Sequence, residues 1–177
     1  MIKIYCFVLT IKSIIGNVFQ NGSLGERYKI LDASGKCERL KISRMETERF
    51  RLRKKTDKGT DIGLIIGAKQ NLHHGDVLLS TSRKMIIVEQ LPEKVISIVL
   101  KTNKIPVQHL IKIGHILGNR HKPIAINPKG IVFFPIDSDA ELNVFTALMH
   151  DIIDFLELTL QERVFQPQSG YNINEEH

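Results

Sequence analysis

The chain has 177 residues, 42% of them hydrophobic, which is enough apolar material for one large domain or two small domains. Its formal net charge is +6 and its isoelectric point is about 9.4. This composition excludes a disordered chain, and its positive charge favours an anionic partner such as nucleic acid, an acidic protein surface or a membrane surface.

The first candidate element is an apolar run from Ile4 to Thr10. Lys12 interrupts it well before the roughly 18 residues that a membrane span needs, and the run lacks a small-residue cleavage site. We therefore expect a core strand here and a cytoplasmic protein. The two cysteines, Cys6 and Cys37, occur in no C-x-x-C motif and near no histidine cluster, so we expect reduced, buried thiols instead of a zinc knuckle or a disulfide framework.

Short β-type segments separated by turn-forming residues continue to about Glu89. Segments at this spacing, without helical periodicity, predict a small barrel or sandwich. The candidate strands are Tyr28–Leu31, Glu38–Ile42, Glu48–Lys54, Asp61–Ile66, Asp76–Leu79 and Met85–Glu89.

The pattern changes after Leu91-Pro92. Lys94–Leu100 is rich in β-branched residues and predicts a strand, and Pro106 suits the first position of a helix. Gly118 is expected to end that helix. One helical face is predicted by the spacing of Val107, Leu110, Ile111, Gly114 and Leu117.

Two extended stretches, Pro123–Ile126 and Ile131–Ile136, follow with a hairpin turn between them. Ser138 and Glu141 then predict a capping box at the start of a second helix. The apolar face of this helix is predicted to contain Leu142, Phe145, Thr146, Met149, Ile152, Ile153 and Leu156, and a last strand to contain Leu158, Leu160, Glu162 and Val164.

The second half therefore has the order β-α-β-β-α-β, which is typical of a ferredoxin-like domain. We expect an α+β protein with a β-rich domain at residues 1–90, a ferredoxin-like domain at 91–166 and a mobile tail at 167–177.

Seven histidines are spread over the chain, and His121 differs from the others because it follows the expected helix end at Gly118. His115 is six residues away, which is not the i, i+4 spacing that places two imidazoles on one helical face. One imidazole is too few for a transition metal, but a twofold axis would bring two copies of His121 together. The remaining histidines are interpreted as surface residues (His73, His74), a solvated helix flank (His109) and a helix edge (His150).

Arg49, Arg51 and Arg53 alternate with apolar residues, which predicts a strand with a basic outer stripe. Such a stripe is either a solvated face or a docking site for an acidic partner. The sequence contains no phosphate-binding loop and no hydrolase or metalloprotease motif, so we do not expect an enzyme.

Several segments resemble the urease accessory protein E family of nickel metallochaperones. The resemblance is carried by Glu48-Arg49-Phe50-Arg51-Leu52-Arg53, by Gly75-Asp76-Val77-Leu78 and above all by Gly118-Asn119-Arg120-His121. Ile15-Gly16-Asn17 and Phe165-Gln166-Pro167 support it.

The resemblance implies a peptide-binding type of N-terminal domain, a ferredoxin-like metal-binding domain, and a homodimer that holds Ni²⁺ at its interface through His121. It implies two further partners, the urease apoprotein complex and the accessory GTPase. The C-terminal His177 would complete the site, whereas His115 stands one place away from a second family histidine, at Ile116. Zn²⁺ and Cu²⁺ are expected to bind the same imidazoles.

Two alternatives remain open on the residues alone. A basic ferredoxin-like domain is also used in RNA recognition, but the consecutive Phe133 and Phe134 should point to opposite faces of their strand. The other alternative is a chaperone that binds peptides through its first domain and uses no metal.

Overall fold

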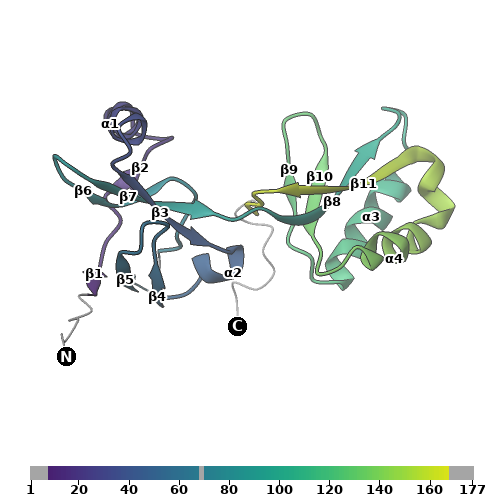
Figure 1. Cartoon of the computed structure of the whole chain (residues 1–177). Coiled ribbons are helices and arrows are strands. Elements are labelled where there is room, and N and C mark those ends of the chain that lie inside the picture. Colours follow the sequence, from purple (N-terminus) through teal and green to yellow (C-terminus); the bar gives the residue numbers. More distant parts are fainter. Residues whose placement is uncertain (1–7, 68–69, 168–177) are drawn as a thin grey trace. The chain divides into compact units, whose positions relative to one another are not determined.

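The structure is a computed structural model that describes residues 8–67 and 70–167, in two compact units that divide between Leu91 and Pro92 (Figure 1). Among the described residues, no helix combines the length and the apolar composition that crossing a bilayer requires. Residues 1–7, including Cys6, lie outside the described residues, and the first strand is β1 (Leu9–Ile11).

Two sheets and one long helix make up the first unit. The strands are ordered β1-β5-β4 in one sheet and β2-β6-β7-β3 in the other. Leu40 and Ile86 of the second sheet share one buried cluster with Ile62 and Leu64 of the first, so the two sheets pack on a common core. The elements are β1, β2 (Gly16–Asn17), α1 (Gly22–Ala33), β3 (Cys37–Ile42), α2 (Arg44–Thr47), β4 (Arg51–Lys55), β5 (Asp61–Ile65), β6 (Asp76–Ser80) and β7 (Met85–Gln90).

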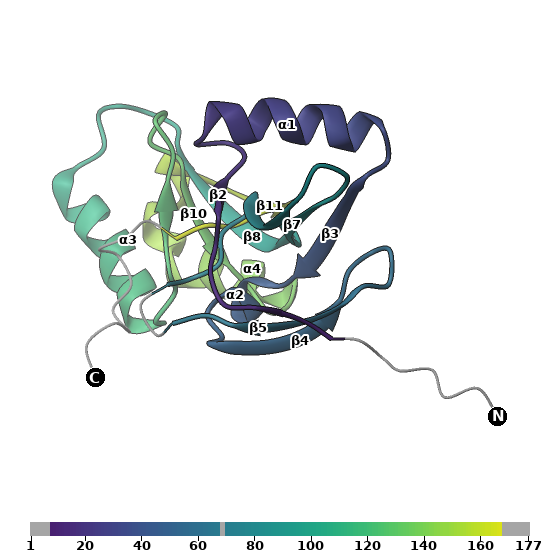
Figure 2. The same ribbon diagram turned by 90° about the vertical axis from the view of Figure 1, so that its left-hand side faces the viewer.

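Helix α1 contradicts the strand predicted at Tyr28–Leu31. Asn21 caps the helix by accepting hydrogen bonds from the backbone N–H groups of Ser23 and Leu24. Leu24, Tyr28 and Leu31 then pack on the face of the second sheet that points away from the first sheet (Figure 2). A narrow stripe of three apolar residues was enough for this helix, because the sheet supplies the rest of its core. The first unit is therefore mixed α and β instead of all-β. Of the two predicted arrangements, barrel or sandwich, the barrel is wrong because neither sheet closes, whereas two sheets do pack on a common core.

The strands predicted from Glu38 onward in this unit are confirmed within one or two residues, except that β4 begins at Arg51 instead of Glu48. Most of the strand predicted at Ile4–Thr10 lies outside the described residues. Strand β4 begins later than predicted because the short helix α2 and its C-cap precede it. Ser43 accepts a hydrogen bond from the backbone N–H of Glu46, and the Glu46 carboxylate accepts one from Ser43 N–H, which is a complete capping box.

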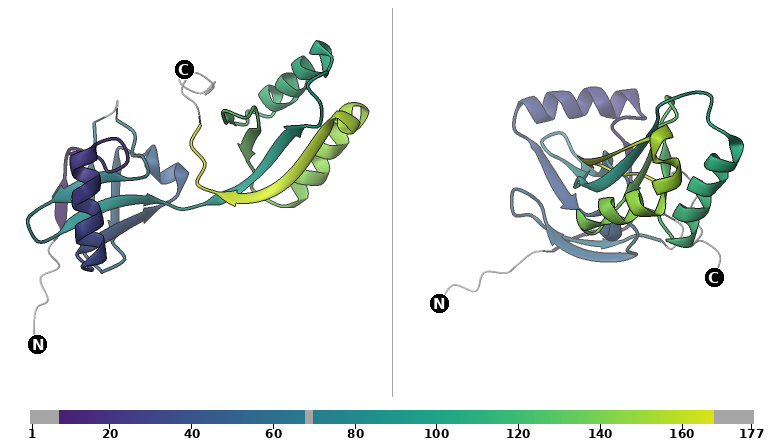
Figure 3. Two further views of the ribbon diagram at one scale, coloured as in Figure 1. Left: turned by 90° about the horizontal axis from the view of Figure 1, so that it is seen from above. Right: turned by 90° about the vertical axis from the view of Figure 1, so that its right-hand side faces the viewer.

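The second unit has the element order β-α-β-β-α-β, with a short 3-10 helix before the last strand. Its single sheet has the strand order β11-β8-β10-β9, with antiparallel neighbours throughout, and the long pair β8 (teal) and β11 (yellow) can be followed in Figure 3. The elements are β8 (Glu93–Leu100), α3 (Val107–Asn119), β9 (Ala125–Ile126), β10 (Val132–Pro135), α4 (Ala140–Leu148), the 3-10 helix η1 (His150–Phe155) and β11 (Leu156–Arg163).

Both α-helices of this unit cover the same face of the sheet. Ile113 and Leu117 of α3 share a buried cluster with Phe145 of α4, and the ring centroid of Phe145 lies 4.6 Å from that of Phe134 on β10. Phe133 belongs to a separate cluster with Val95 and Phe165. The prediction that Phe133 and Phe134 point to opposite faces is therefore confirmed.

Three local predictions in this unit are wrong. The α4 helix ends at Leu148, and the residues that follow form η1, so Leu156 already belongs to β11. Ser138 makes no capping box, because the N-cap is Asp139, whose side chain makes no capping hydrogen bond. Gly118 lies inside α3, which ends after Asn119.

Candidate metal centre

The end of helix α3 is a Schellman turn in which His121 occupies the left-handed position. The backbone N–H of His121 donates to the carbonyl of Gly118 at 2.9 Å, and that of Lys122 donates to the carbonyl of Leu117 at 3.2 Å. His121 has a φ of 49°, and within the described ranges it is the only residue other than glycine with a positive φ. Glycine usually fills this position because a Cβ atom costs energy there. His121, in the position that glycine usually fills, is therefore the residue that turns the chain out of the helix.

An ion pair joins this turn to helix α4. Lys122 Nζ lies 2.7 Å from Glu141 Oε2 at the start of α4, and both side chains are largely buried. Burial would raise the pKa of the Glu141 carboxyl, but the hydrogen bonds from Lys122 and from the Asp137 backbone N–H outweigh it and hold the pKa below its usual range. Glu141 was expected to complete a capping box with Ser138. Its carboxylate accepts from the Asp137 backbone N–H and also ties α4 to the residue after His121.

His115 is engaged by another residue of the same motif. Its Nε2 atom lies 3.0 Å from the Asn119 side-chain nitrogen, one helical turn further on. A metal at this nitrogen would have to displace Asn119. Both His115 and His121 are exposed, and His177 lies outside the described residues.

One chain alone does not assemble a metal site within residues 8–67 and 70–167. Nowhere in this part of the chain do three histidine, cysteine, aspartate or glutamate side chains gather in a group that could hold a metal ion. His121 is thus a rigidly presented single imidazole, which needs ligands from elsewhere to bind a transition metal tightly.

The remaining histidines differ in how far they are buried and in what they contact. His109 does not lie on a solvated flank, because it is half-buried with its ring centroid 5.1 Å from that of Phe155. His74 accepts a hydrogen bond from the Gln90 backbone N–H at Nδ1 and stacks on Phe19, so it is not a free surface residue. His73 is exposed, as expected, whereas His150, expected at the edge of the second helix, is exposed and begins the 3-10 helix η1.

Helix α3 presents apolar side chains on its outer face as well as its inner face. The apolar face predicted for this helix is mostly exposed. Leu117 is its only buried member, and the side chains of Val107, Ile111 and Leu110 are 70%, 67% and 41% exposed. Ile113 and the half-buried Ile116 pack on the sheet instead. A Cβ atom added at Gly114 or Gly118 would meet no atom within 4 Å, so packing inside the chain does not require glycine there. The exposed stripe runs along the helix toward the turn that carries His121.

Two of the family-like segments in the first unit form a single structural contact. Asn17 and Asp76 are both buried, and Asn17 Nδ2 donates to Asp76 Oδ1 at 2.9 Å and to the His74 carbonyl at 2.8 Å. Gly75, between them, has a φ of 87°, and a Cβ atom there would lie 2.5 Å from the Phe19 ring. These residues hold β2 against β6, and that role explains their types without a ligand.

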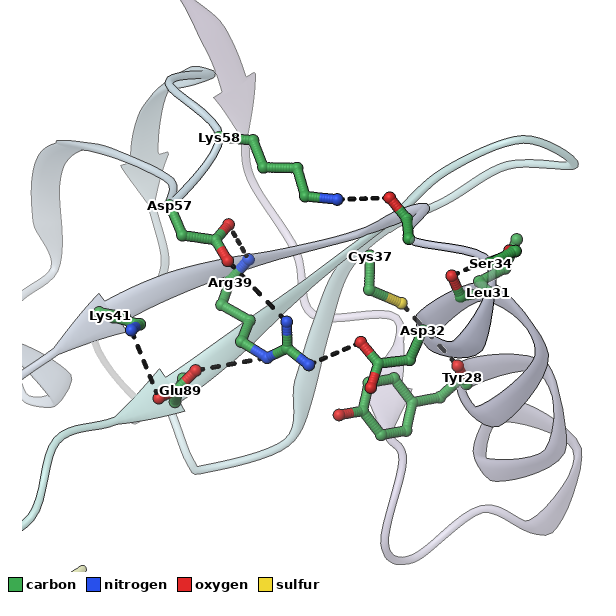
Figure 4. Close-up of polar contacts among 11 residues, drawn as sticks. Tyr28, Leu31, Asp32, Ser34, Cys37, Arg39, Lys41, Asp57, Lys58 and Glu89 are labelled. Carbon is green, nitrogen blue, oxygen red and sulfur yellow. Dashed lines mark hydrogen bonds and ion pairs between the residues drawn. The ribbon is translucent and has the colours of Figure 1, made fainter.

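Arg39 and Cys37 of β3 belong to a structural network (Figure 4). Arg39 pairs with Asp32 at 2.6 Å, Glu89 at 3.4 Å and Asp57 at 3.9 Å, which links α1, β7 and the turn after β4. Cys37 is a free, buried thiol, as predicted. Burial and then the nearby Asp32 carboxylate raise its pKa, so it stays protonated and is a poor metal ligand.

The predicted basic stripe is displaced by two residues. Arg49 precedes β4, so the outer face of the strand carries Arg51, Arg53 and Lys55. Arg53 makes a two-point contact with Asp61, at 3.2 Å from Nε to Oδ1 and 2.8 Å from Nη2 to Oδ2. Lys55 continues the same alternation, but it was not among the residues predicted for the stripe.

Comparison with known proteins relates the chain to one family. The family model described as "UreE urease accessory protein, N-terminal domain" matches residues 11–91. The chain is 29% identical to the urease accessory protein UreE of Natronomonas pharaonis over 133 residues, which cover 75% of this chain and 61% of the relative. It is 25% identical to UreE of Acinetobacter baylyi over 142 residues, covering 79% and 80% of the two chains. With UreE of Staphylococcus aureus the identity is 38% over 68 residues, covering 38% and 43%.

The match to the Natronomonas protein spans less than two thirds of that relative, whereas the Acinetobacter match spans most of both chains. Relatives that all have the same name thus match this chain through its first unit and into its second. Residues 11–91 thus belong to the UreE N-terminal domain family, and the chain is similar over most of its length to urease accessory proteins UreE.

Proposed function

We propose that this protein is a nickel metallochaperone, not an enzyme, that binds Ni²⁺ reversibly between two copies of His121 and passes it to the urease apoprotein. The observation that carries this proposal is the geometry of His121. An exposed imidazole occupies a backbone position that normally belongs to glycine, at the end of a helix whose outer face is apolar. A local strain of this kind is kept where the side chain has a function.

The exposed face of α3 supports a homodimer. Val107 and Ile111 are large apolar residues in solvent, and the open space at Gly114 and Gly118 would let a second helix approach closely. In an isologous contact the same face meets itself, so the two turns that follow the helices would come together near the twofold axis. Two imidazoles would then face one ion, and His177 could add a further ligand.

The second unit is the metal-binding domain in this proposal, and we infer a ferredoxin-like arrangement for it. Its element order and the strand order β11-β8-β10-β9 support that arrangement. The first unit then acts as the domain of peptide-binding type, with the urease complex and the accessory GTPase as partners in the cytoplasm.

RNA recognition is not favoured over this function. Phe133 is 4% exposed and Phe134 is fully buried, so neither ring is available for base stacking on this sheet.

Titration calorimetry with Ni²⁺ tests the proposal. Wild-type protein should bind tightly, His121→Ala should lose the tight phase, and His150→Ala should behave like wild type because it removes an exposed histidine of the same unit. A chain truncated before His177 should bind more weakly but still measurably. Unchanged tight binding by His121→Ala would remove the turn from the metal site.

The affinity should also fall as the pH is lowered, because neutral imidazole binds metals and imidazolium does not. Zn²⁺ should compete for the same site, and Cu²⁺ should bind more tightly than Ni²⁺. A nickel affinity that stays constant between pH 7.5 and about pH 5.5 would contradict imidazole ligands.

A further inference from the structure

Strand β4 lies at the edge of its sheet and has one side available for another strand. Among the described residues it pairs with β5 alone. The backbone N–H of Ile66 donates to Phe50 and that of Thr56 to Thr60, so the even-numbered residues of this segment make the bonds to β5. In an antiparallel ladder the alternate residues direct their N–H and C=O groups to the opposite side. The outward backbone groups therefore include those of Arg51 and Lys55.

The same alternation places the cationic side chains. Arg51 and Lys55 are exposed, while Leu52 and Lys54 between them are half-buried and face the core side of the sheet. Within the described part of the chain, neither Arg51 nor Lys55 has a carboxylate within ion-pair distance, in contrast to Arg53 with Asp61. Ile65, opposite Arg51 on β5, adds an apolar surface that is 45% exposed.

The exposed positive charges of β4 favour some partner strands over others. A second copy of β4 would place its own cations beside Arg51 and Lys55, and like charges directly opposite each other destabilise a strand pair. A strand with carboxylates at every second position would bring them onto the cationic face, and its backbone would satisfy the outward groups of β4. Backbone hydrogen bonds would supply affinity and the alternating charges specificity.

We propose that β4 binds an extended acidic segment of a partner protein as an additional strand, with aspartate or glutamate at alternate positions opposite Arg51 and Lys55. This interaction goes beyond the metal function and does not depend on it. It resides in the first unit, and metal-free protein should show it.

The test uses a labelled peptide in which glutamate alternates with valine or threonine, and measures its fluorescence anisotropy with the full-length, metal-free protein. Arg51→Glu/Lys55→Glu should weaken binding about tenfold or more. The control Lys36→Glu/Arg83→Glu changes the same net charge at exposed positions of the same unit and should leave binding unchanged. Equal effects of the two double variants would reduce the interaction to net charge and overturn the proposal.

Two N-methylated peptides test strand addition without altering the protein. One carries methyl groups on the glutamate nitrogens and the other on the intervening nitrogens. An added strand uses only one of these two sets toward β4, so one peptide should lose binding and the other keep it, and the sensitive set reports the strand direction. Equal affinities of the two peptides would overturn strand addition.

Two further measurements separate this proposal from its alternatives. A short single-stranded RNA that binds through Arg51 and Lys55 while the peptide does not bind would identify nucleic acid as the occupant and overturn the proposal. Arg51→Glu/Lys55→Glu should bind nickel as wild type does, because His121 lies in the other unit. Failure of the peptide experiments thus leaves the nickel proposal standing, and failure of the nickel titration leaves this one standing.

Discussion

The backbone of His121 has a φ of 49°, a conformation in which glycine has no steric penalty and other residues pay roughly 1 kcal/mol. The two hydrogen bonds of the Schellman turn hold that conformation in place. A histidine here costs stability, and the turn fixes the backbone position from which its exposed imidazole projects. The amide partner of His115, Asn119, lies in the same short motif, so the motif combines helix termination with side-chain positioning.

A first prediction follows for His121→Gly. Glycine removes the left-handed penalty, so the free energy of unfolding should increase by about 0.5–1 kcal/mol, while tight nickel binding should disappear. His121→Ala retains a Cβ atom and should lose nickel without gaining stability. Urea unfolding of the metal-free variants measures both effects, and a destabilised His121→Gly would contradict the turn geometry.

A second prediction concerns Glu141. Glu141→Gln should lower the free energy of unfolding by about 1–2 kcal/mol at neutral pH, because it removes the charged partner of the largely buried Lys122. The folded-state pKa of Glu141 is depressed, so its stabilisation is present above the unfolded-state pKa of about 4.3 and is lost as the pH falls through the lower folded-state value.

The difference between wild type and Glu141→Gln should therefore shrink as unfolding is measured at pH values falling below about 4.3. Asp139→Asn is the matched control, since Asp139 forms an exposed ion pair with Lys94 and should contribute less than about 0.5 kcal/mol. A difference for Glu141→Gln that persists unchanged into acid would show that the ion pair is not its source.

At the scale of secondary structure, helix α3 has one apolar face on its own core and a second face in solvent. We predict that Ile111→Asp shifts the protein from dimer to monomer, because it places a charge in the centre of the proposed contact. Val144→Asp alters an exposed apolar residue of α4 and should leave the dimer intact. Light scattering coupled to size exclusion measures both masses, and an undisturbed dimer for Ile111→Asp would place the interface elsewhere.

The wrong predictions of helices and strands have physical causes. Alternation and turn residues located β3, β5, β6 and β7, because these strands carry enough buried side chains to set the pattern. Helix α1 was missed because only three of its apolar side chains, Leu24, Tyr28 and Leu31, pack on its sheet, and the short apolar run at its end resembles a strand. On α3 the apolar residues surround most of the helix, so periodicity could not tell the core face from the exposed one.

The candidate site was partly predictable for a similar reason. The sequence identified His121 as the histidine at a helix end, but it assigned the helix stop to Gly118, since glycine is the usual residue there. The ion pair between Lys122 and Glu141 joins the turn to another element, so local pattern could not reveal it. The contact between Asn17 and Asp76 spans 59 residues and was likewise visible only as two separate motifs.

At the scale of the whole molecule, the two proposed interactions reside in different compact units. The turn that carries His121 belongs to the second unit and the edge strand β4 to the first, so the proposed metal site and the proposed partner site do not share residues. The net charge of +6 favours acidic partners in general, and Arg51 and Lys55 give that preference a location. Because each unit has its own buried core, variants in one should leave binding by the other intact.

In the proposed function, two chains share one nickel ion through His121. A crystal structure of the nickel-loaded protein, with anomalous diffraction recorded at the nickel edge, tests this arrangement. We expect an anomalous peak on a twofold axis within bonding distance of the imidazoles of both His121 residues. A nickel peak bound within one chain, or on histidines other than His121, would contradict it.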